Sequence, residues 1–435
     1  MKLEPTCLKA MSNPVKVIGG GIAGLSAALR LQDAGVGYEL HEASSGFGGK
    51  IQSSELDGVL IDAGADNFVT RNSEFSDLVE RLGLASHVVH PISKQAPFVF
   101  VDGELHPLPG ETYIGIPRKD LGSSFGPIKN TYIESPDEVL TQGSVSIDEV
   151  VKSEFTAEVA ELLVNPLLGG VNAASIDSLD FEASLPGLYE QYRKSGSLTK
   201  VVNAIPKPAG GKVFAGLALT TKGLIDAIVA ELDPNRVFLN SPIEKLSEAP
   251  TVLATPSFAA NQVLSNSKIN VSSLEDINYA SVAQVTVTFN AGEIDLPDSS
   301  GVIFPTSDNQ RLSAATFLSS KWQHYKDSGK AIVRLTTGKQ DSGWDVSTID
   351  DQELTQTLLD EFAQVVNFGS HRQVRVVRWN KGLPHYSVGH ARRVREIRTD
   401  LTKLAPEVAL AGAAYDGIGI PACWQSGVNA ANAFI

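Results

Sequence analysis

The stretch VIGGGIAGL, residues 17–25, places three glycines between a β-branched run and an apolar pattern with helical spacing. Gly19, Gly21 and Gly24 follow the spacing GxGxxG. The first glycine permits a tight turn, the second admits a phosphate close to the backbone, and the third lets helix and strand pack closely. The N–H groups and the dipole at the start of such a helix favour a pyrophosphate. The stretch therefore predicts a strand, a turn and a helix that bind a dinucleotide.

A second strand pattern, GYELHEA (residues 37–43), ends in an acidic residue, Glu42, which lies 18 positions after Gly24. A carboxylate at this place can accept hydrogen bonds from a ribose diol and repels a 2′-phosphate, which disfavours NADP. The next stretch, GFGGKIQS (residues 46–53), brings a second glycine pair, Gly48 and Gly49. A second close approach of backbone to ligand so soon indicates a ligand longer than NAD, and this favours FAD.

The composition of this 435-residue chain is that of a globular protein with two or three domains, with 42% apolar and 20% charged residues. A formal net charge of −14 offers no broad basic face, which argues against nucleic acid as the main partner. The two cysteines lie far apart without a CxxC motif, which favours a reducing, cytoplasmic compartment. The sequence has no apolar run of about 18 residues that would predict a membrane-spanning helix. Residues 1–11 lack the apolar core of a secretory signal, so we expect a disordered leader or a start at Met11.

Further motifs follow in an order that resembles the flavin-dependent amine-oxidase superfamily and, within it, the porphyrinogen oxidases. The resemblance runs from about Val15 to Phe434 and is greatest for the group from Gram-positive, especially actinobacterial, organisms. The motifs are DAGADNFVTR (62–71), LHPLPG (105–110), GIP (115–117), NPLLGGVNAAS (165–175), TFLSSKW (316–322), RWNKGLPHYSVGH (378–390) and AGAAYDGIGIPACWQSG (411–427).

The resemblance implies an α/β fold: a Rossmann-like FAD-binding domain of the glutathione-reductase and amine-oxidase type, a sheet-based substrate domain and a helical insert. We expect a discontinuous FAD-binding domain, an insert that is mostly helical and a separate sheet domain. Period-two alternation in residues 279–289 predicts a sheet strand, and residues 213–220 read as a loop before an amphipathic helix. The expected bounds are 12–75, 210–272 and 374–435 for the FAD-binding domain, 76–209 for the helical insert and 273–373 for the substrate-binding sheet domain.

The resemblance also implies which residues line the cofactor. The glycine turn should hold the pyrophosphate, Glu42 the adenosine ribose, residues 64–67 the isoalloxazine, and residues 418–420 its N1 and O2 edge. Ile243 could contact the adenine or could equally be a core residue of a strand. Trp379 could lie near the flavin or could only pack in the core. The cofactor set is Gly19, Gly20, Gly21, Ile22, Ala23, Gly24, Glu42, Ala43, Gly48, Gly49, Lys50, Gly64, Ala65, Asp66, Asn67, Ile243, Trp379, Ile418, Gly419 and Ile420.

The substrate set follows from the carboxylates and the flat apolar faces of a porphyrinogen. Arg71 matches an arginine that pairs a propionate in the family, although it could instead be a surface arginine beside the following helix. Arg334 is a weaker candidate for the same role. We expect apolar faces and close backbone approach from the rest of the set. Its members are Arg71, Gly169, Gly170, Phe317, Trp322 and Arg334.

Departures from the family pattern fall at four places. Ala65 stands for a proline, Asn67 for a serine and Asn172 for an aromatic residue, and the connection before LATP (residues 253–256) is shorter than the usual β-excursion. The change at Asn172 leaves the shape of that part of the substrate pocket open. We expect no catalytic acid, base or metal, because the electrons pass to the flavin, and His385 and His390 lack the acidic or cysteine neighbours of a metal site.

The resemblance implies FAD-dependent oxidation of coproporphyrinogen III to coproporphyrin III in haem biosynthesis, by six electrons, with three O₂ reduced to three H₂O₂. Oxidation of protoporphyrinogen IX is the alternative. An amine oxidase, a carotenoid desaturase and a flavoprotein that only carries a porphyrin are the rivals from other classes. Cys423 raises the question of a covalently linked flavin. Peripheral contact with a membrane and hand-off of product to a ferrochelatase are left open.

Overall fold

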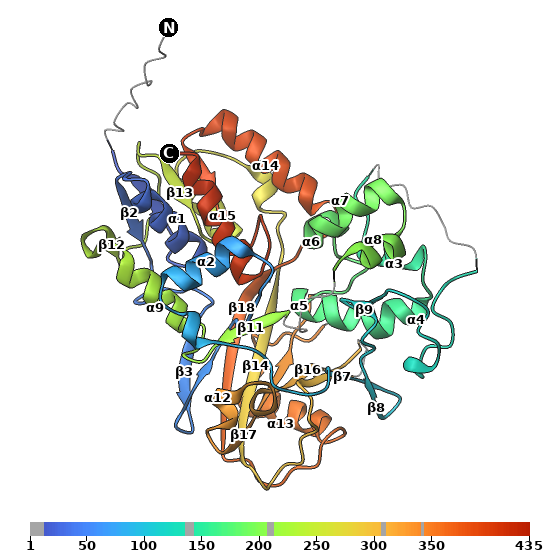
Figure 1. The fold of residues 1–435 in the computed structure, drawn as a ribbon. Helices are drawn as coiled ribbons and strands as arrows, with labels where there is room; N and C mark the ends of the chain where they lie inside the picture. The colour runs from blue at the N-terminus through green and yellow to red at the C-terminus, as the bar shows by residue number, and fades with distance from the viewer. Residues whose placement is uncertain (1–12, 135–142, 207–212, 306–309, 341–342) are drawn as a thin grey trace.

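A computed structural model describes residues 13–134, 143–206, 213–305, 310–340 and 343–435 (Figure 1). The predicted leader, residues 1–11, lies outside the described residues. Four larger hydrophobic clusters organise the chain: one on each face of a parallel sheet, one among helices, and one under a larger mixed sheet.

The parallel sheet contains five strands in the order β12 (Val237–Phe238), β2 (Tyr38–His41), β1 (Val15–Ile18), β13 (Thr251–Leu253) and β19 (Val408–Leu410). Every pairing is parallel, so the carboxyl ends of all strands meet at one edge. Val17 and Ile18 point to opposite clusters because side chains alternate across a strand. The glycine turn after β1 therefore lies at the edge where an α/β sheet binds its ligand.

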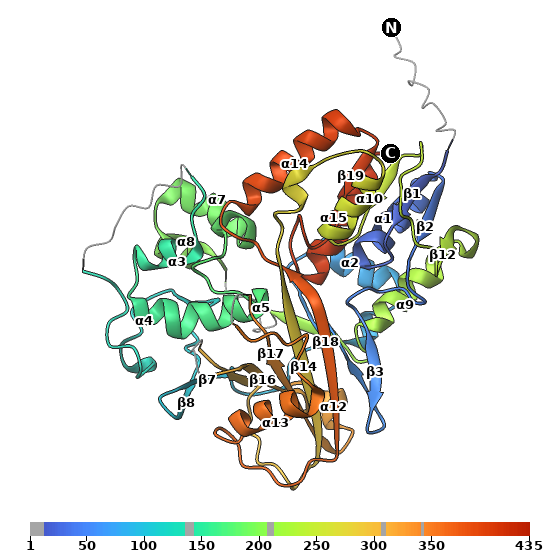
Figure 2. The ribbon, with the colours of Figure 1, turned by 180° about the vertical axis from the view of Figure 1, so that it is seen from behind.

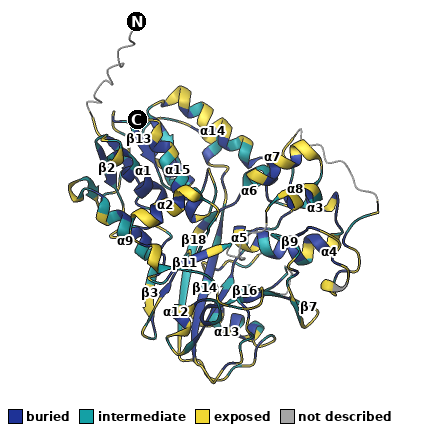
Figure 3. Cartoon of the chain, in the orientation of Figure 1, coloured by how far each residue is buried: buried dark blue, intermediate teal, exposed yellow. Residues whose placement is uncertain are grey.

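Helices cover both faces of this sheet. The first face packs against α1 (Ile22–Asp33), α9 (Lys222–Glu231), α15 (Ile420–Asn432) and α2 (Ser73–Arg81), and α1 is buried along most of its length (Figure 3). The second face packs against α10 (Ser257–Asn266) and α14 (His390–Leu404), which the view from behind shows (Figure 2). A Cβ added to Gly427 would lie 1.9 Å from the Ala23 carbonyl oxygen, so α15 packs directly on the start of α1.

The larger sheet has seven strands in the order β18 (Gln373–Pro384), β14 (Tyr279–Asn290), β17 (Lys330–Thr337), β16 (Leu312–Phe317), β15 (Gly301–Ile303), β7 (Phe98–Val101) and β8 (Glu104–Pro107). The alternation predicted for residues 279–289 is confirmed by β14. Val285, Val287 and Phe289 pack in one cluster with α13 (Asp351–Phe362), so that face is apolar. The opposite face carries Gln284, Thr286, Thr288 and Arg334 at its middle, between the apolar residues Val282 and Ile332.

The helical unit gathers around its own core. Its elements are α3 (Ile147–Lys152), α4 (Ala157–Val159), the π-helix η3 (Ala160–Gly169), α5 (Gly170–Asn172), α6 (Phe181–Ser184), α7 (Pro186–Ser195) and α8 (Leu198–Ala204). Ser146 and Glu149 form a capping box at the start of α3. Pro166 lies inside η3, where it cannot donate a backbone hydrogen bond.

Short elements connect these units. They are β3 (Ser53–Leu56), β4 (Val59–Asp62), β5 (Phe68–Val69), β6 (Val88–Val89), β9 (Thr112–Tyr113), β10 (Ile116–Pro117), β11 (Phe214–Leu217), α11 (Leu318–Lys321) and α12 (Gln323–Lys326), with single 3₁₀ turns at Ala85–His87, Gly122–Ser124, Pro234–Arg236 and Ser272–Leu274.

The larger sheet extends beyond the bounds predicted for it. Residues 98–107, expected in the helical insert, form β7 and β8, and β7 pairs with β15. Residues 374–384, expected in the FAD-binding domain, belong to the edge strand β18, which pairs with β14. Residues 214–217 are a strand rather than the predicted loop, because they pair with β5 and β6. All three pairings join segments far apart in the sequence, which local patterns do not encode.

Candidate functional site

The turn after β1 has the geometry that its glycines predict. Gly19 has φ +106°, and its N–H donates to the His41 carbonyl oxygen at 2.8 Å. A Cβ at Gly24 would lie 1.8 Å from the Gly19 carbonyl oxygen, so only glycine fits there. A Cβ at Gly21 would meet nothing within 4 Å, and Gly21 begins α1 without a side-chain cap or an acidic residue in the first turn. The helix start is thus open to an anion.

Glu42 follows β2 and lies beside this turn. Its Oε2 accepts from the Gly20 N–H at 2.7 Å, and its Oε1 accepts from the Ser44 N–H at 2.8 Å. A Cβ at Gly20 would lie 3.1 Å from Oε2 and 2.6 Å from the Phe47 ring. The carboxylate is therefore oriented at the sheet edge, as binding of a ribose diol requires.

The second glycine pair lies against the first turn. The Gly48 N–H donates to the Gly20 carbonyl oxygen at 2.8 Å, and a Cβ at Gly49 would lie 3.3 Å from the Gly21 Cα. Lys50 comes next, with its ammonium 5.9 Å from the Tyr279 ring centroid. Burial lowers the pKa of Lys50. The backbone segments 19–21 and 48–50 thus lie side by side and form one continuous surface from the start of α1 toward residues 64–67.

The turn after β4, residues 63–67, is held by side chains from three other segments. The Trp379 Nε1–H donates to the Ala63 carbonyl oxygen at 3.0 Å, and the Thr221 hydroxyl donates to the Ala65 carbonyl oxygen at 2.6 Å. A Cβ at Gly64 would lie 2.0 Å from the Lys50 carbonyl oxygen. Among the hydrogen bonds of the described residues, none comes from the N–H groups of Gly64 and Ala65. The turn is fixed, with donors left for a ligand.

Arg334 supplies the strongest of these contacts. Its Nη1 donates to Asp66 Oδ2 at 2.7 Å and its Nη2 donates to the Asp62 carbonyl oxygen at 2.6 Å. Burial would raise the pKa of Asp66, but Arg334 and Lys321 hold that pKa below its usual value. Asp66 also accepts from the Asn67 amide through its other oxygen. The Asp66 carboxylate is thus committed to protein partners.

Asp62 lies under the same turn. It is 3% exposed, and its Oδ1 accepts from the Thr221 N–H at 2.8 Å and from the Thr221 hydroxyl at 2.6 Å. Burial raises the pKa of Asp62 to about 6. Arg375 donates to the Asp62 carbonyl oxygen at 3.1 Å, so two arginines of the larger sheet hold this strand end.

The C-terminal turn provides a second open helix start. Gly419 is the N-cap of α15, which has Pro421 in its first turn, no side-chain cap and no acidic residue there. Gly417 has φ +117°, and its N–H donates to the Tyr386 hydroxyl at 2.9 Å. Ile418 packs against the helical core. The N–H groups and dipole of α15 favour negative charge at this place.

The residues present therefore fit a flavin dinucleotide. The open start of α1 suits a pyrophosphate, Glu42 suits a ribose, and the free N–H groups of residues 64–65 and the start of α15 suit the polar edges of an isoalloxazine. A Cβ at Gly21 would project into open space, so the backbone there is accessible to a phosphate.

The face of the larger sheet that carries Arg334 lies over the turn after β4. Thr286 is opposite Arg334 on β17 and opposite Arg375 on β18, so the three share one face. Gln284 lies two residues earlier on the same face, and its Oε1 is buried with no hydrogen-bond partner among the described atoms. The sheet face that presents Arg334 and Arg375 to the turn therefore also presents the unpaired Gln284 Oε1.

Of the predicted substrate residues, Arg71 and Gly170 are exposed, whereas Gly169 is buried. Arg71 precedes α2, is exposed, and donates from Nη1 to the Tyr113 hydroxyl at 2.8 Å. The helix that follows is capped by Asn72 instead, so Arg71 does not cap it. Gly169 has no room for a Cβ beside the Ala174 carbonyl oxygen, whereas Gly170 is open.

Three predicted substrate contacts lie in cores or in an ion pair, and the strand expected at Ile243 is not formed. Phe317 is 0% exposed on the apolar sheet face, and Trp322 is 1% exposed in a small core. Arg334 donates its hydrogen bonds to Asp66 and to the Asp62 carbonyl oxygen. Its geometry therefore favours a role in holding the turn and not in pairing a propionate. Ile243 lies in an irregular connection, not a strand, and packs beside α10 and α14. In each case the position of the side chain is set by the sheet face or the neighbouring element against which it packs.

The sequence interpretation missed Thr221, Arg375, Gln284 and Lys321. The first three contact or face the turn after β4. A signal existed for Gln284, since it is the polar member of an alternating run with Thr286. Thr221 and Arg375 carry no local signal, because their partners are distant in the sequence.

The remaining titratable candidates have structural partners. Cys423 donates to the Gly417 carbonyl oxygen at 3.3 Å, and burial raises the pKa of its thiol to about 12. His390 stacks on Tyr386 with ring centroids 4.2 Å apart and contacts the Ala414 carbonyl oxygen. His385 contacts the Ser178 hydroxyl at 3.1 Å. Within the described ranges, no group of three His, Cys, Asp or Glu side chains could hold a metal ion.

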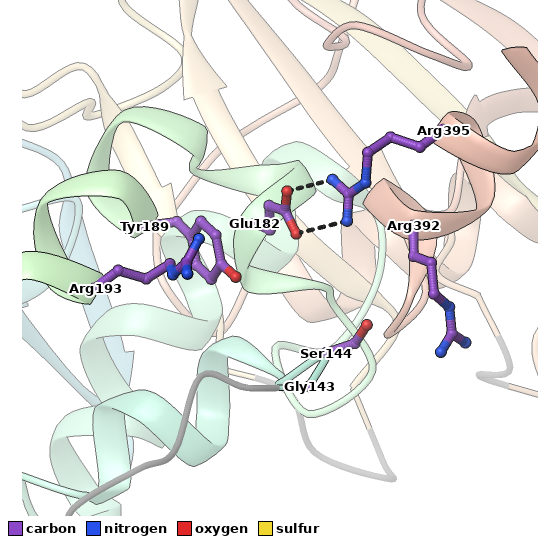
Figure 4. A pocket seen from close by; sticks show the side chains of 7 residues that line it. All are labelled: Gly143, Ser144, Glu182, Tyr189, Arg193, Arg392 and Arg395. Atoms are coloured by element: carbon purple, nitrogen blue, oxygen red, sulfur yellow. Dashed lines mark hydrogen bonds and ion pairs between the residues drawn. The ribbon is translucent and has the colours of Figure 1, made fainter. Parts of the chain in front are cut away.

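A separate hollow of about 370 Å³ lies between α6, α7 and α14 (Figure 4). Arg193, Arg392 and Arg395 line it, and Glu182 accepts two hydrogen bonds from Arg395. None of the predicted site residues lines this hollow.

Comparison with known proteins decides the family. The model of the family "Flavin containing amine oxidoreductase" matches residues 22–435. The chain belongs to this family. It is a flavoenzyme with FAD as its cofactor, as the site geometry predicts, and the Rossmann-like α/β fold predicted from the sequence is confirmed.

Individual relatives cover nearly the whole chain. A coproporphyrinogen III oxidase of Bacillus subtilis is 30% identical over 95% of this chain and 96% of its own. One of Staphylococcus aureus is 26% identical over 98% of this chain and 99% of its own. A crystal structure of a candidate protoporphyrinogen oxidase from Exiguobacterium sp. 255-15 superposes with a TM-score of 0.85 at 26% identity, over 98% of this chain and 99% of that chain.

The helices in the described part of the chain are too short or too polar to cross a membrane.

Proposed function

We propose that this flavoenzyme oxidises coproporphyrinogen III to coproporphyrin III in haem biosynthesis. The observation that carries the proposal is the end-to-end match to the Bacillus subtilis coproporphyrinogen III oxidase, 30% identical over 95% of this chain. It is supported by a cofactor cradle that is complete at the sheet edge, from Gly19 through Glu42 to residues 64–67.

When bound, FAD accepts the electrons removed from the porphyrinogen and passes them to an acceptor. The protein's own residues would position it: the start of α1 would hold the pyrophosphate, and Glu42 would hold the ribose. Thr221, Trp379 and Arg334 hold the turn that faces the ring. The start of α15 favours negative charge on the ring. Positioning of the reactants is the main contribution we assign to the chain.

On the substrate side, we propose that Arg71 pairs a propionate. Its guanidinium is exposed and is oriented by the Tyr113 hydroxyl and ring. Gly170, which has open space around it, allows backbone to approach the macrocycle. Arg334 is not included, because its donors are already used at the turn after β4.

The acceptor and the location belong to the same proposal. We propose molecular oxygen as the acceptor, with three O₂ reduced to three H₂O₂ for each six-electron oxidation. We also propose a cytoplasmic enzyme.

One assay tests the reaction and its main alternative. The purified holoenzyme is incubated aerobically with coproporphyrinogen III and, separately, with protoporphyrinogen IX, while porphyrin fluorescence and peroxide are followed. We expect faster turnover of coproporphyrinogen III, with three peroxides per porphyrin. Faster turnover of protoporphyrinogen IX would select the alternative, which the name of the Exiguobacterium relative favours. Porphyrin binding without turnover would identify a carrier.

Two measurements test whether the protein is instead an amine oxidase or a desaturase. One asks whether the flavin is covalently linked, and the other asks whether an amine or a carotenoid is turned over. The Cys423 thiol, with its pKa raised to about 12, is a poor nucleophile at neutral pH. We therefore expect acid precipitation to release all the flavin into the supernatant. A yellow pellet, or turnover of a primary amine or a carotenoid, would favour a different member of the family.

A further inference from the structure

Lys321, the last residue of α11, has an unusual environment for a lysine. Its side chain is half-buried, and its ammonium lies 4.9 Å from the ring centroid of Trp322, which is itself 1% exposed. Among the described residues, no carboxylate lies within ion-pair distance of this ammonium and no hydrogen bond satisfies it. Burial lowers the pKa of Lys321.

Contacts place Lys321 beside the turn after β4. The Trp322 ring lies 3.2 Å from where a Cβ on Gly216 would be, and that same point is 3.3 Å from the Asp66 carbonyl oxygen. The Lys321 ammonium also interacts electrostatically with both Asp66 and Arg334. The charge therefore lies in the neighbourhood of residues 64–67, although it is absent from the hydrogen-bond network there.

Asp66 does not form an ion pair with Lys321. One of its carboxylate oxygens accepts from Arg334 at 2.7 Å and the other from the Asn67 amide. Asp66 forms its ion pair with Arg334, so the Lys321 ammonium has the Asp66 charge nearby but no ion pair of its own among the described residues. Partial removal of an ammonium from water without an ion pair disfavours the free protein, and a negative charge in a complex would offset that cost.

We propose that Lys321 is the electrostatic partner of the bound flavin, and that its ammonium stabilises negative charge on the reduced isoalloxazine. The inference rests on the proposed function, because residues 64–67 face the ring there. Lys321 differs in this from Arg334, which holds the turn but faces a carboxylate of the protein. Positive charge near the ring favours the reduced cofactor and so raises its reduction potential.

The test compares three variants as holoenzymes without any porphyrinogen. Lys321→Met keeps the length and removes the charge, Lys321→Arg keeps the charge, and Lys326→Met removes an exposed lysine of the neighbouring helix α12. The midpoint potential of the bound flavin is measured by dye-coupled reduction. We expect Lys321→Met to disfavour reduction at least tenfold, about 30 mV for a two-electron couple. The other two variants should stay near wild type.

A second measurement distinguishes charge from shape. In the FAD-free protein, Lys321→Met should raise the thermal unfolding temperature, because it removes a half-buried charge that has no ion pair, whereas Lys326→Met should not. If Lys321→Met folds but no longer binds FAD, restored binding in Lys321→Arg supports the proposal. Loss of binding in both would overturn it, since shape would then matter and not charge.

Two further results would overturn the inference. An unchanged potential in Lys321→Met, with the KM for a porphyrinogen raised, would assign Lys321 to a substrate carboxylate. An unchanged potential with unchanged KM would show a lysine without a role at the site. A wild-type protein that takes up no FAD at all would instead overturn the proposed function, so the two failures are distinguishable.

Discussion

Arg334 and Asp66 form a buried ion pair, with 2.7 Å between Nη1 and Oδ2 and side chains that are 4% and 14% exposed. The pair joins β17 of the larger sheet to the turn after β4, and thus connects two units that are 268 positions apart in the sequence. Because Nη2 of the same guanidinium also binds the Asp62 carbonyl oxygen, one side chain fixes both ends of the turn.

Removing this guanidinium should destabilise the protein and weaken FAD binding. We expect Arg334→Met to lower the free energy of unfolding by about 3 to 5 kcal/mol, because it leaves the Asp66 carboxylate buried and unpaired. Urea unfolding of the FAD-free protein measures this loss. Arg395→Met, which breaks the exposed pair with Glu182, should cost about 1 kcal/mol or less. Equal losses in the two variants would contradict the assigned role of Arg334.

The free energy of unfolding should depend on pH through the titration of Asp62. Its folded pKa is raised to about 6, whereas a carboxyl of an unfolded chain titrates near about 4. Between these values the folded protein keeps the proton and the unfolded chain loses it, so stability falls as pH rises from about 4 to about 6. Above that range the loss is complete and constant.

Asp62→Asn should remove most of that loss, about 2 to 3 kcal/mol, because the amide is neutral and its oxygen can still accept from Thr221. Urea unfolding at pH 4.5 and pH 8 for variant and wild type measures the difference. Asp77→Asn, at an exposed position of α2, serves as the control. The same pH dependence in Asp62→Asn and wild type would show that Asp62 is not the group that titrates.

The glycine turn allows stability and cofactor binding to be separated. Gly21→Ala adds a methyl group that meets no atom within 4 Å, so the free energy of unfolding without FAD should stay within about 1 kcal/mol of wild type. The methyl group occupies the approach of the pyrophosphate, so FAD titration calorimetry should show a Kd raised tenfold or more. Gly46→Ala, which is equally open, should leave both quantities unchanged. Tight FAD binding by Gly21→Ala would place the pyrophosphate elsewhere.

Arg71→Ala tests the substrate side. The guanidinium lies 5.4 Å from the Tyr113 ring centroid and is free to pair a carboxylate, so its loss should raise the KM for coproporphyrinogen III about tenfold, with FAD content unchanged. Arg193 has the same arrangement over Tyr189, at 5.8 Å, and Arg193→Ala should leave KM unchanged. An unaltered KM in Arg71→Ala would remove this residue from the site.

The elements around the cofactor were predictable because their determinants are local. The spacing of Gly19, Gly21 and Gly24 dictates a turn and a helix start whatever the rest of the chain does, since the steric contacts lie within a few residues. Alternation along residues 279–289 predicted β14 for the same reason. The trimmed connection after β12 is also visible in the sequence, and the described residues between β12 and β13 contain no strand.

The environment of several side chains was decided by tertiary pairing. Phe317 was expected at the pocket but lies on the apolar face of the larger sheet. The pairing of β16 with β17 decides this, because it sets the face of the sheet to which the Phe317 side chain points. Trp322 lies in a core made by the β3–β4 hairpin and α12, and residues 98–107 join a sheet whose other strands come from beyond position 300 or near 280. No local pattern specifies such partners.

The sequence by itself determined the cofactor class and the open helix start that receives the cofactor, because a glycine turn is a property of a few adjacent residues. Only the tertiary structure decided that Arg334 holds the turn rather than a substrate carboxylate, and that Lys321 lies near Asp66 without forming an ion pair with it. The physical reason is that an ion pair depends on distance in space, and Asp66 is brought to Arg334 only when the two units pack.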